Sequence, residues 1–203
     1  SGNTMLRAFL ASYFYTKDGL LKDFSTLKSI NAFNNRSNYE SIENFPKIKY
    51  FQKNPEEIHK YWQIGQENIK KSFLNKIIFL KTHNAQIKFN KYNFTNNLLT
   101  KCFIYIVRDP RSVLLSTMSH YGHKSQKEAK EFLISDKHLT YATTKGKLPE
   151  FILSWKSNFI SWQNFYKLNP KLGYIIKYED LILNREINFY NILEFICNKI
   201  GTK

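Results

Sequence analysis

The sequence predicts an α/β fold in which helices flank a mainly parallel sheet. Three short apolar runs alternate with helical patterns along the chain, which is typical of parallel strand–helix units. The clearest run, residues 102–107 (CFIYIV), is continuous and of strand length, as expected for a strand buried on both faces. With 203 residues, of which 42% are hydrophobic, the chain can bury one real core. We therefore expect a single domain over residues 1–203.

The first part of the chain predicts two helices separated by a polar stretch. Residues 4–15 carry apolar side chains at helical spacing and end near a turn signal at 17–19 (KDG). Residues 25–46 are rich in Asn and Ser, so we expect mostly loop there. A second helix is expected from Pro55 to about residue 73, with Asn54 as its N-cap and Pro at its first turn.

The rest of the chain alternates strands with helices. We expect strands over 77–80, 102–107 and 173–177, and helices over 110–120, 151–166 and 185–200. The first of these helices begins with Pro110, and Asp109 is its expected N-cap. The segments 84–100 and 121–150 are polar, and we expect a loop in the first and one weak helix in the second.

Charge and cysteine content narrow the classes of function. The chain has 31 Lys and Arg against 16 Asp and Glu, a net charge of +15, which favours nucleic acid, a membrane surface or a phosphorylated small molecule as partner. A bias of the whole chain toward Lys and Asn explains part of this charge equally well, as solvated surface. Two cysteines exclude a disulfide framework or a four-cysteine zinc site, so we expect a reducing, cytoplasmic location. The apolar runs are too short to span a membrane.

Chemistry-bearing residues follow each predicted strand. Lys81 and His83 follow the first strand, Arg108 follows the second and Tyr178 follows the third. In open α/β sheets, ligands bind beyond the carboxyl ends of the strands, so these side chains are expected at one edge. Ser1-Gly2-Asn3-Thr4 precedes the first helix, where backbone amides and hydroxyls suit a phosphate or sulfate group.

Taken in order, these motifs resemble those of the sulfotransferases that use 3′-phosphoadenosine 5′-phosphosulfate, the cytosolic type and its bacterial relatives. The matching pieces are Ser1-Gly2-Asn3-Thr4 (end of the phosphosulfate loop), 79–83 (FLKTH), 105–111 (YIVRDPR), Ser116 eight residues after Arg108, the helix with Ser154-Trp155 and Trp162, and 177–181 (KYEDL). The resemblance covers nearly the whole chain and implies a P-loop-like parallel sheet flanked by helices, the sulfotransferase fold.

The resemblance also implies how the donor is bound. The loop Ser1-Gly2-Asn3-Thr4 is expected to hold the 5′-phosphosulfate at the helix start. Arg108 and Ser116 are expected to bind the 3′-phosphate through charge-assisted hydrogen bonds. Tyr178 is expected to line the adenosine side. Met5 stands where the family has a Trp that stacks on adenine.

The catalytic roles follow from the same resemblance. His83 is expected to act as general base toward the acceptor hydroxyl, for which an ordinary pKa of ~6.5 is suitable. Lys81 is expected to stabilise the transferring group. The reaction would move a sulfuryl group to a hydroxyl of a small-molecule or carbohydrate acceptor, leave adenosine 3′,5′-bisphosphate and need no metal. His120 and His123 have metal-ligand spacing, but no third ligand is evident.

The sequence departs from the family pattern at its two ends. The loop lysine and the strand that should precede Ser1 are not in the sequence, and neither is the Gly-rich segment expected after Lys203. We therefore expect that the domain continues at both ends, through an N-terminal strand and a C-terminal segment.

Other interpretations remain open at this point. Ser1-Gly2-Asn3-Thr4 fits an ordinary helix cap, Arg108 could pair with Glu179 or Asp180, and the tryptophan stripe fits a core. A P-loop hydrolase or kinase requires Gly-x-x-x-x-Gly-Lys-Ser/Thr, which the loop lacks. The main alternative is a basic nucleic-acid-binding or nucleotide-binding P-loop-like domain without sulfotransfer activity. We expect no nucleic-acid partner, because the basic residues are scattered and no known motif appears.

Overall fold

Within the described part of the chain, the strands form three separate pairs, two of them parallel. The computed structural model describes residues 2–21, 23–73, 76–143 and 146–201. β1 (Asn31–Ala32) pairs with β2 (Leu80–Lys81), and β5 (Phe103–Val107) pairs with β6 (Gly173–Lys177), both in parallel. β3 (Lys88–Phe89) and β4 (Tyr92–Asn93) form an antiparallel hairpin. The parallel pairing of β1 with β2 and of β5 with β6 agrees with the mainly parallel sheet that the sequence predicts, but the two pairs are separate.

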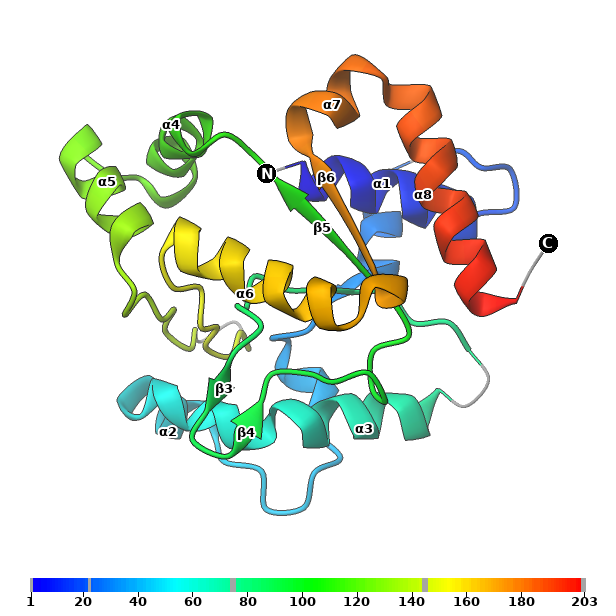
Figure 1. Cartoon of the computed structure of the whole chain (residues 1–203). Helices are drawn as coiled ribbons and strands as arrows, with labels where there is room; N and C mark the ends of the chain where they lie inside the picture. Colours follow the sequence, from blue (N-terminus) through cyan, green and yellow to red (C-terminus); the bar gives the residue numbers. More distant parts are fainter. Residues whose placement is uncertain (1, 22, 74–75, 144–145, 202–203) are drawn as a thin grey trace.

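Helices connect and cover these strands (Figure 1). They are α1 (Asn3–Tyr15), α2 (Ile48–Lys53), α3 (Trp62–Ser72), α4 (Pro110–Tyr121), α5 (Gln126–Ile134), α6 (Trp155–Leu168), α7 (Tyr178–Leu183) and α8 (Arg185–Ile200). Short 3₁₀ helices are η1 (Phe24–Ser29), η2 (Arg36–Asn38), η3 (Pro55–Tyr61) and η4 (Pro170–Leu172).

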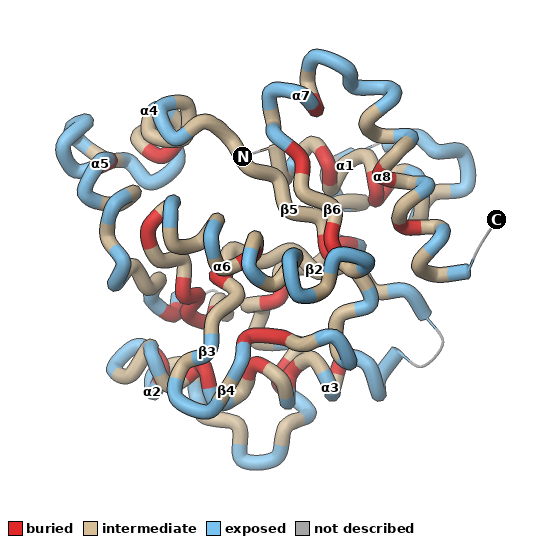
Figure 2. Tube along the Cα trace, in the orientation of Figure 1, coloured by how far each residue is buried: buried red, intermediate tan, exposed pale blue. Residues whose placement is uncertain are grey.

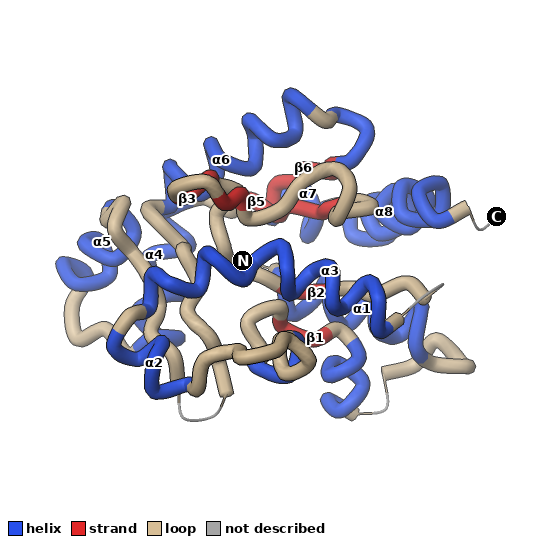
Figure 3. Tube along the Cα trace, turned by 90° about the horizontal axis from the view of Figure 1, so that it is seen from below, coloured by secondary structure: helices blue, strands red, loops and turns tan. Residues whose placement is uncertain are grey.

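The pair β5–β6 separates two helical layers. Because side chains alternate between the faces of a strand, Phe103 and Tyr105 pack in the cluster that includes α6, whereas Ile104 and Ile106 pack in the cluster of α1 and α8. α6 therefore covers one face of the pair and α1 the other (Figure 3). The strands need close packing at Gly173, where a Cβ atom would lie 2.5 Å from the Phe103 ring.

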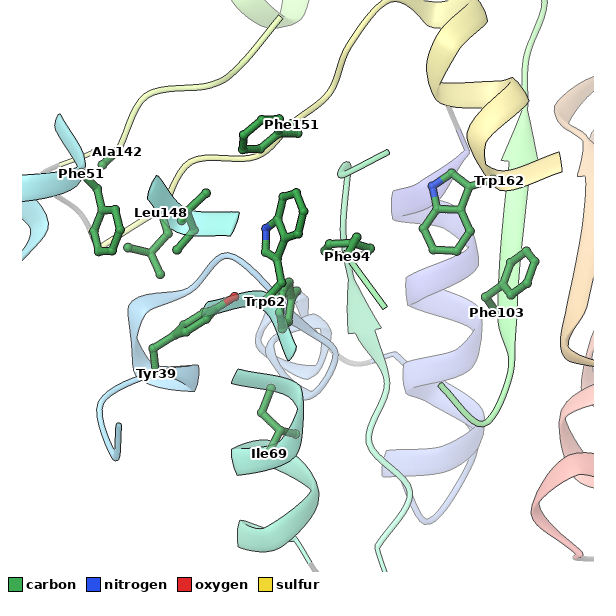
Figure 4. Close-up of a cluster of buried hydrophobic side chains, with 12 residues drawn as sticks. Tyr39, Phe51, Trp62, Ile69, Phe94, Phe103, Ala142, Leu148, Phe151 and Trp162 are labelled. Atoms are coloured by element: carbon green, nitrogen blue, oxygen red, sulfur yellow. The ribbon is translucent and has the colours of Figure 1, made fainter. Parts of the chain in front are cut away.

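The larger core surrounds Trp62 at the start of α3. Its ring stacks edge-on against Phe94 and Phe151, at centroid distances of 5.5 and 5.1 Å, and Tyr39 and Leu148 lie in the same cluster (Figure 4). Trp62 is 0% exposed, and burying a side chain of this size is worth about 3 kcal/mol or more by area. This core fixes α3 against the segment that carries Phe151.

Of the two helix caps that the sequence predicts, Asp109 is confirmed and Asn54 is not. The Asp109 carboxylate accepts a hydrogen bond from Arg111 N at 2.8 Å and begins α4. Ser154 caps α6 in the same way, so this helix begins at Trp155, four residues later than expected. Asn54 makes no side-chain capping bond, and the chain first forms the 3₁₀ helix η3 before α3.

The structure contains several short elements that the sequence analysis did not predict. The stretch 25–46 contains β1, the polar stretch 84–100 contains the β3–β4 hairpin, and the Tyr-Glu-Asp segment forms α7. Each strand concerned has only two residues, which is too short for an alternating pattern. Such strands form because neighbouring segments supply their hydrogen-bond partners.

Exposed residues are frequent from the end of α4 through α5 and in the first turn of α8 (Figure 2). α5 buries only Ala129. None of the helices in the described ranges is long and apolar enough to cross a membrane.

Candidate functional site

The start of α1 lies at the carboxyl end of the β5–β6 pair (Figure 1). Gly2 has φ 70°, in the left-handed region, and a Cβ atom here would lie 2.6 Å from the Tyr178 ring and 3.7 Å from Ile106. Glycine is therefore required twice, by its backbone conformation and by close packing. The first amides of α1 are held next to Tyr178.

Arg108 meets the same tyrosine. Its guanidinium carbon lies 4.6 Å from the centre of the Tyr178 ring, which is cation–π geometry. Its Nε is buried and has no hydrogen-bond partner among the described residues. Nor does Arg108 form an ion pair with Glu179 or Asp180, both of which are described. A buried guanidinium nitrogen without a partner is costly and suits an anionic group.

The neighbouring acids are engaged elsewhere. The Asp109 carboxylate binds the Arg111 side chain, and this pair lowers the pKa of Asp109 to about 2. The Glu179 carboxylate accepts a hydrogen bond from Asp109 N at 3.1 Å. Arg108 is thus left as the free cation at the end of β5 within the described part of the chain.

The other predicted donor-site residues have different surroundings. Asn3 has a buried side-chain oxygen without a hydrogen-bond partner in the described ranges, and Thr4 is exposed. Ser1 lies outside the described residues. Met5 is partly buried and packs on the cluster of α1, α8 and β5–β6. Ser116 is partly buried on α4, the helix that follows Arg108.

Lys81 and His83 end the other parallel pair, where the buried Glu150 orders the backbone. One carboxylate oxygen of Glu150 accepts hydrogen bonds from His83 N at 2.8 Å and from the Thr82 hydroxyl at 3.1 Å. The other oxygen accepts from Asn34 Nδ2 at 3.1 Å. Glu150 is 5% exposed, and this burial raises its pKa, partly offset by the hydrogen bond from His83 N.

Burial and nearby positive charge set the state of His83. Burial lowers the pKa of His83 to about 3, and Lys81 and His120 lower it in addition. The pKa of Lys81 is itself lowered by burial, an effect that Glu150 opposes. His83 is therefore neutral at pH 7, but in this structure it is a weaker base than the imidazole with an ordinary pKa that the sequence led us to expect. No described residue is hydrogen bonded to either nitrogen of its ring.

The first turn of α6 hydrogen bonds to the backbone that follows β5 and to the backbone that follows β2. Trp155 Nε1 donates a hydrogen bond to Arg108 O at 3.1 Å, and Asn158 Nδ2 donates to His83 O at 3.1 Å. Asn158 also accepts from the Tyr105 hydroxyl at 2.9 Å. The residues that follow the two parallel pairs are thus fixed by one helix. Trp162 is different: it is 7% exposed and part of the core, as the alternative interpretation of the tryptophan stripe proposed.

The predicted residues accordingly fall into two groups joined by α6. Gly2 and Arg108 both contact Tyr178, and Lys81 lies close enough to His83 to lower its pKa. Among the described residues, no hydrogen bond joins Ser116 to Arg108.

The comparison with known families agrees with this arrangement. Residues 1–201 match the model of the family described as "Sulfotransferase domain". The chain belongs to this family. It is therefore a transferase domain of the sulfotransferase type, with parallel strand pairs flanked by helices. No curated protein matches the chain as a relative.

In this sulfotransferase domain, Glu150 is the site residue that sequence reasoning missed. Its only signal was an acid within an otherwise apolar run, Leu148 to Phe151, since acids are rarely buried without partners. Asn158 was missed as well, although the resemblance singled out its helix.

The possible metal site at His120 and His123 gains no further ligand. Among the described residues, no three His, Cys, Asp or Glu side chains gather as a metal site would require. Both histidines instead contact the ring of Tyr121, with centroid distances of 4.8 and 6.0 Å.

Proposed function

We propose that this sulfotransferase domain moves a sulfuryl group from 3′-phosphoadenosine 5′-phosphosulfate to an acceptor hydroxyl. The observation that carries the proposal is the unpartnered guanidinium of Arg108, held over Tyr178 beside the start of α1. A nucleotide with a 3′-phosphate provides an anion for Arg108, and its 5′-phosphosulfate provides a second anion for a helix start.

The residues present fit this donor. The Arg108 Nε is a buried donor without an acceptor among the described residues, and glycine at position 2 lets the first amides of α1 pack directly against the Tyr178 ring. We propose that Arg108 and Ser116 bind the 3′-phosphate, that residues 1–4 bind the phosphosulfate and that Tyr178 lines the adenosine side. When bound, the donor supplies a sulfuryl group attached to a phosphate leaving group.

The second group of residues supports the chemistry on the acceptor. His83 is neutral and so can take the proton of the hydroxyl that attacks sulfur. Burial and Lys81 weaken it as a base, and a donor anion bound near Lys81 offsets part of this effect. Lys81 lies close to His83, and its positive charge stabilises the negative charge on the sulfuryl oxygens. Glu150 holds the backbone amide of His83 and so positions this base.

Calorimetric titration with adenosine 3′,5′-bisphosphate, with ATP as comparison, tests the donor site. We expect the bisphosphate to bind at least ten times more tightly than ATP, and Arg108→Ala to weaken it by about 30-fold or more, as for a charged hydrogen bond of roughly 2 kcal/mol. Arg111→Ala is the matched control, because Arg111 is exposed and pairs with Asp109.

Two results would contradict the proposal. Equal affinity for ATP and the bisphosphate would mean that no 3′-phosphate site exists. Equal losses in Arg108→Ala and Arg111→Ala would mean that binding follows general surface charge, as expected for the alternative of a basic nucleic-acid-binding domain.

A further inference from the structure

A cationic pocket adjoins the site at Lys81 and does not include Arg108 in its lining. It has a volume of about 520 Å³, within the range of small-molecule sites. Asn31 and Ala32 of β1 form one wall, and Lys81 at the end of β2 belongs to both the pocket and the catalytic group. Through Lys81, which lowers the pKa of His83, the pocket is linked to the residues on the acceptor side of the proposed reaction.

Four cations from four separate segments line this pocket: Arg7 of α1, Lys28 of η1, Lys81 of β2 and Lys147. No acidic side chain from the described ranges is among the residues that line it. Like charges from different segments repel one another, so gathering them costs free energy. Such an arrangement is expected where an anion is bound.

One carboxylate cannot neutralise all of these cations. Glu150 partly offsets the charge of Lys81 and Lys147, but it does not line the pocket, and one of its oxygens already accepts bonds from His83 N and the Thr82 hydroxyl. A single buried carboxylate is thus shared by two lysines. Burial lowers the pKa of Arg7, Lys81 and Lys147. The positive charge of Arg7 lowers the pKa of the two lysines further.

Arg7 is held in place without a carboxylate. Its Nη2 donates to Leu27 O and Ile30 O, both at 2.8 Å, and its Nε is buried with no partner in the described part of the chain. The guanidinium is thus oriented by the backbone of η1 while one donor remains unused. This is a second observation that points to a missing acceptor atom.

The opposite rim of the pocket is also fixed by backbone contacts. Leu148 N donates to Asn34 O at 2.7 Å, and Arg36 N donates to Gly146 O at 2.9 Å. These bonds hold Lys147 against Asn35, which lines the same pocket. The lysine is therefore placed by a bridge between two chain segments rather than by a free loop.

We propose that this pocket binds an acidic group, a carboxylate or a sulfate ester, on the acceptor molecule. The inference rests on the proposed function, because Lys81 and His83 make this the acceptor side of the reaction. Lys28, Lys147 and Arg7 hold the acid, and the acceptor hydroxyl then lies toward His83. The domain thus selects acidic acceptors over neutral ones of the same shape.

Matched acceptors that differ only in charge test this selectivity. The probes are 4-nitrophenyl β-glucuronide and its uncharged methyl ester, and a 6-sulfated N-acetylglucosaminide and its unsulfated parent. Binding is measured by calorimetry with adenosine 3′,5′-bisphosphate present, and transfer by the release of the bisphosphate from the sulfated donor. We expect at least one acid to be preferred tenfold or more over its neutral match, and the pair that shows this identifies carboxylate or sulfate.

Charge removal then locates the effect. Lys28→Gln/Lys147→Gln should reduce the preference for the acid at least tenfold while bisphosphate affinity changes by less than twofold. The control, Lys130→Gln/Lys167→Gln, removes the same charge from exposed positions on α5 and α6 and should keep the preference.

The possible outcomes separate this inference from the proposed function. No preference for either acid, no binding of any acid by protein that binds the bisphosphate, or equal effects of the two double variants would overturn the acidic-acceptor pocket. Loss of bisphosphate binding in Lys28→Gln/Lys147→Gln would also overturn it and assign the pocket to the donor. Failure of the unmodified protein to bind the bisphosphate would instead count against the proposed function.

Discussion

Replacement of Glu150 by glutamine should destabilise the domain while the Arg108 site is kept. Glu150→Gln preserves shape but removes the charge of a carboxylate that accepts bonds from His83 N, the Thr82 hydroxyl and Asn34 Nδ2. The new amide can still accept two of these bonds through its oxygen. Its NH₂ group, however, must face the NH₂ group of Asn34.

The size of the effect follows from these contacts. One hydrogen bond to a charged acceptor is lost, worth about 1.5–3 kcal/mol, and a buried donor is left unpaired at a cost of about 1–3 kcal/mol. Against this, the variant no longer buries a carboxylate, whose raised pKa shows that burial disfavours its charge. We expect a net loss of about 2 kcal/mol, which for a chain of 203 residues lowers the melting temperature by roughly 4–8 °C.

Urea unfolding followed by circular dichroism measures this change, and calorimetry measures donor affinity. Glu131→Gln is the control, because Glu131 is an exposed acid on α5 and should change stability by less than about 0.5 kcal/mol. In Glu150→Gln, transfer should also slow at unchanged bisphosphate affinity, since the amide of His83 loses its charged partner. Stability equal to that of the control would refute the role of Glu150 as an ionised acceptor.

Two further predictions concern His83 and Gly2. Because the folded pKa of His83 is about 3 and the unfolded value is ~6.5, kcat/KM for the donor, which reports the free enzyme, should show no loss of activity through pH 6.5; an acidic limb near 6.5 would contradict the burial of this base. The unfolded state binds a proton on His83 more tightly than the folded state does. The contribution of neutral, buried His83 to stability is therefore fully present above pH 6.5. It is lost as the pH falls toward 3, by up to about 1.4 kcal/mol per pH unit. Glu150, whose pKa is raised, acts in the opposite direction, so the comparison must be made between wild type and His83→Gln, which should have the flatter profile. Gly2→Ala must adopt a positive φ at a cost of about 1–2 kcal/mol and place its Cβ 2.6 Å from the Tyr178 ring. It should weaken bisphosphate binding tenfold or more, whereas Gly122→Ala, which also has positive φ but meets nothing within 4 Å, should bind normally.

The elements that the sequence predicted best are those with local signals. β6 has the expected bounds, 173–177, and α4 begins at Pro110 because Asp109 caps it. The strand expected at 77–80 is reduced to Leu80–Lys81, and its partner β1 was not expected. This pairing depends on where Asn31 meets Leu80 in space, and a local pattern contains no information on that contact.

The same division holds for the candidate site. Residues at strand ends, such as Arg108 and His83, could be predicted as site residues because motif and position agreed. Glu150 was not, since its function depends on a chain segment 67 residues away in sequence reaching the amide of His83. The pocket at Lys28 and Lys147 was missed for the same reason, because it is assembled from distant segments.

The two groups of site residues, around Arg108 and around His83, differ in their electrostatics. Arg108 presents its free guanidinium through a cation–π contact that leaves its charge unneutralised, whereas Lys81 and His83 are buried together with Glu150 as the nearest acid. A bound anion close to Lys81 would offset the positive charge that lowers the pKa of His83 and would make the base stronger. On this argument the acidic limb of kcat, measured with donor bound, lies at higher pH than that of kcat/KM for the donor. Identical limbs would mean that Lys81 and the donor do not act on His83.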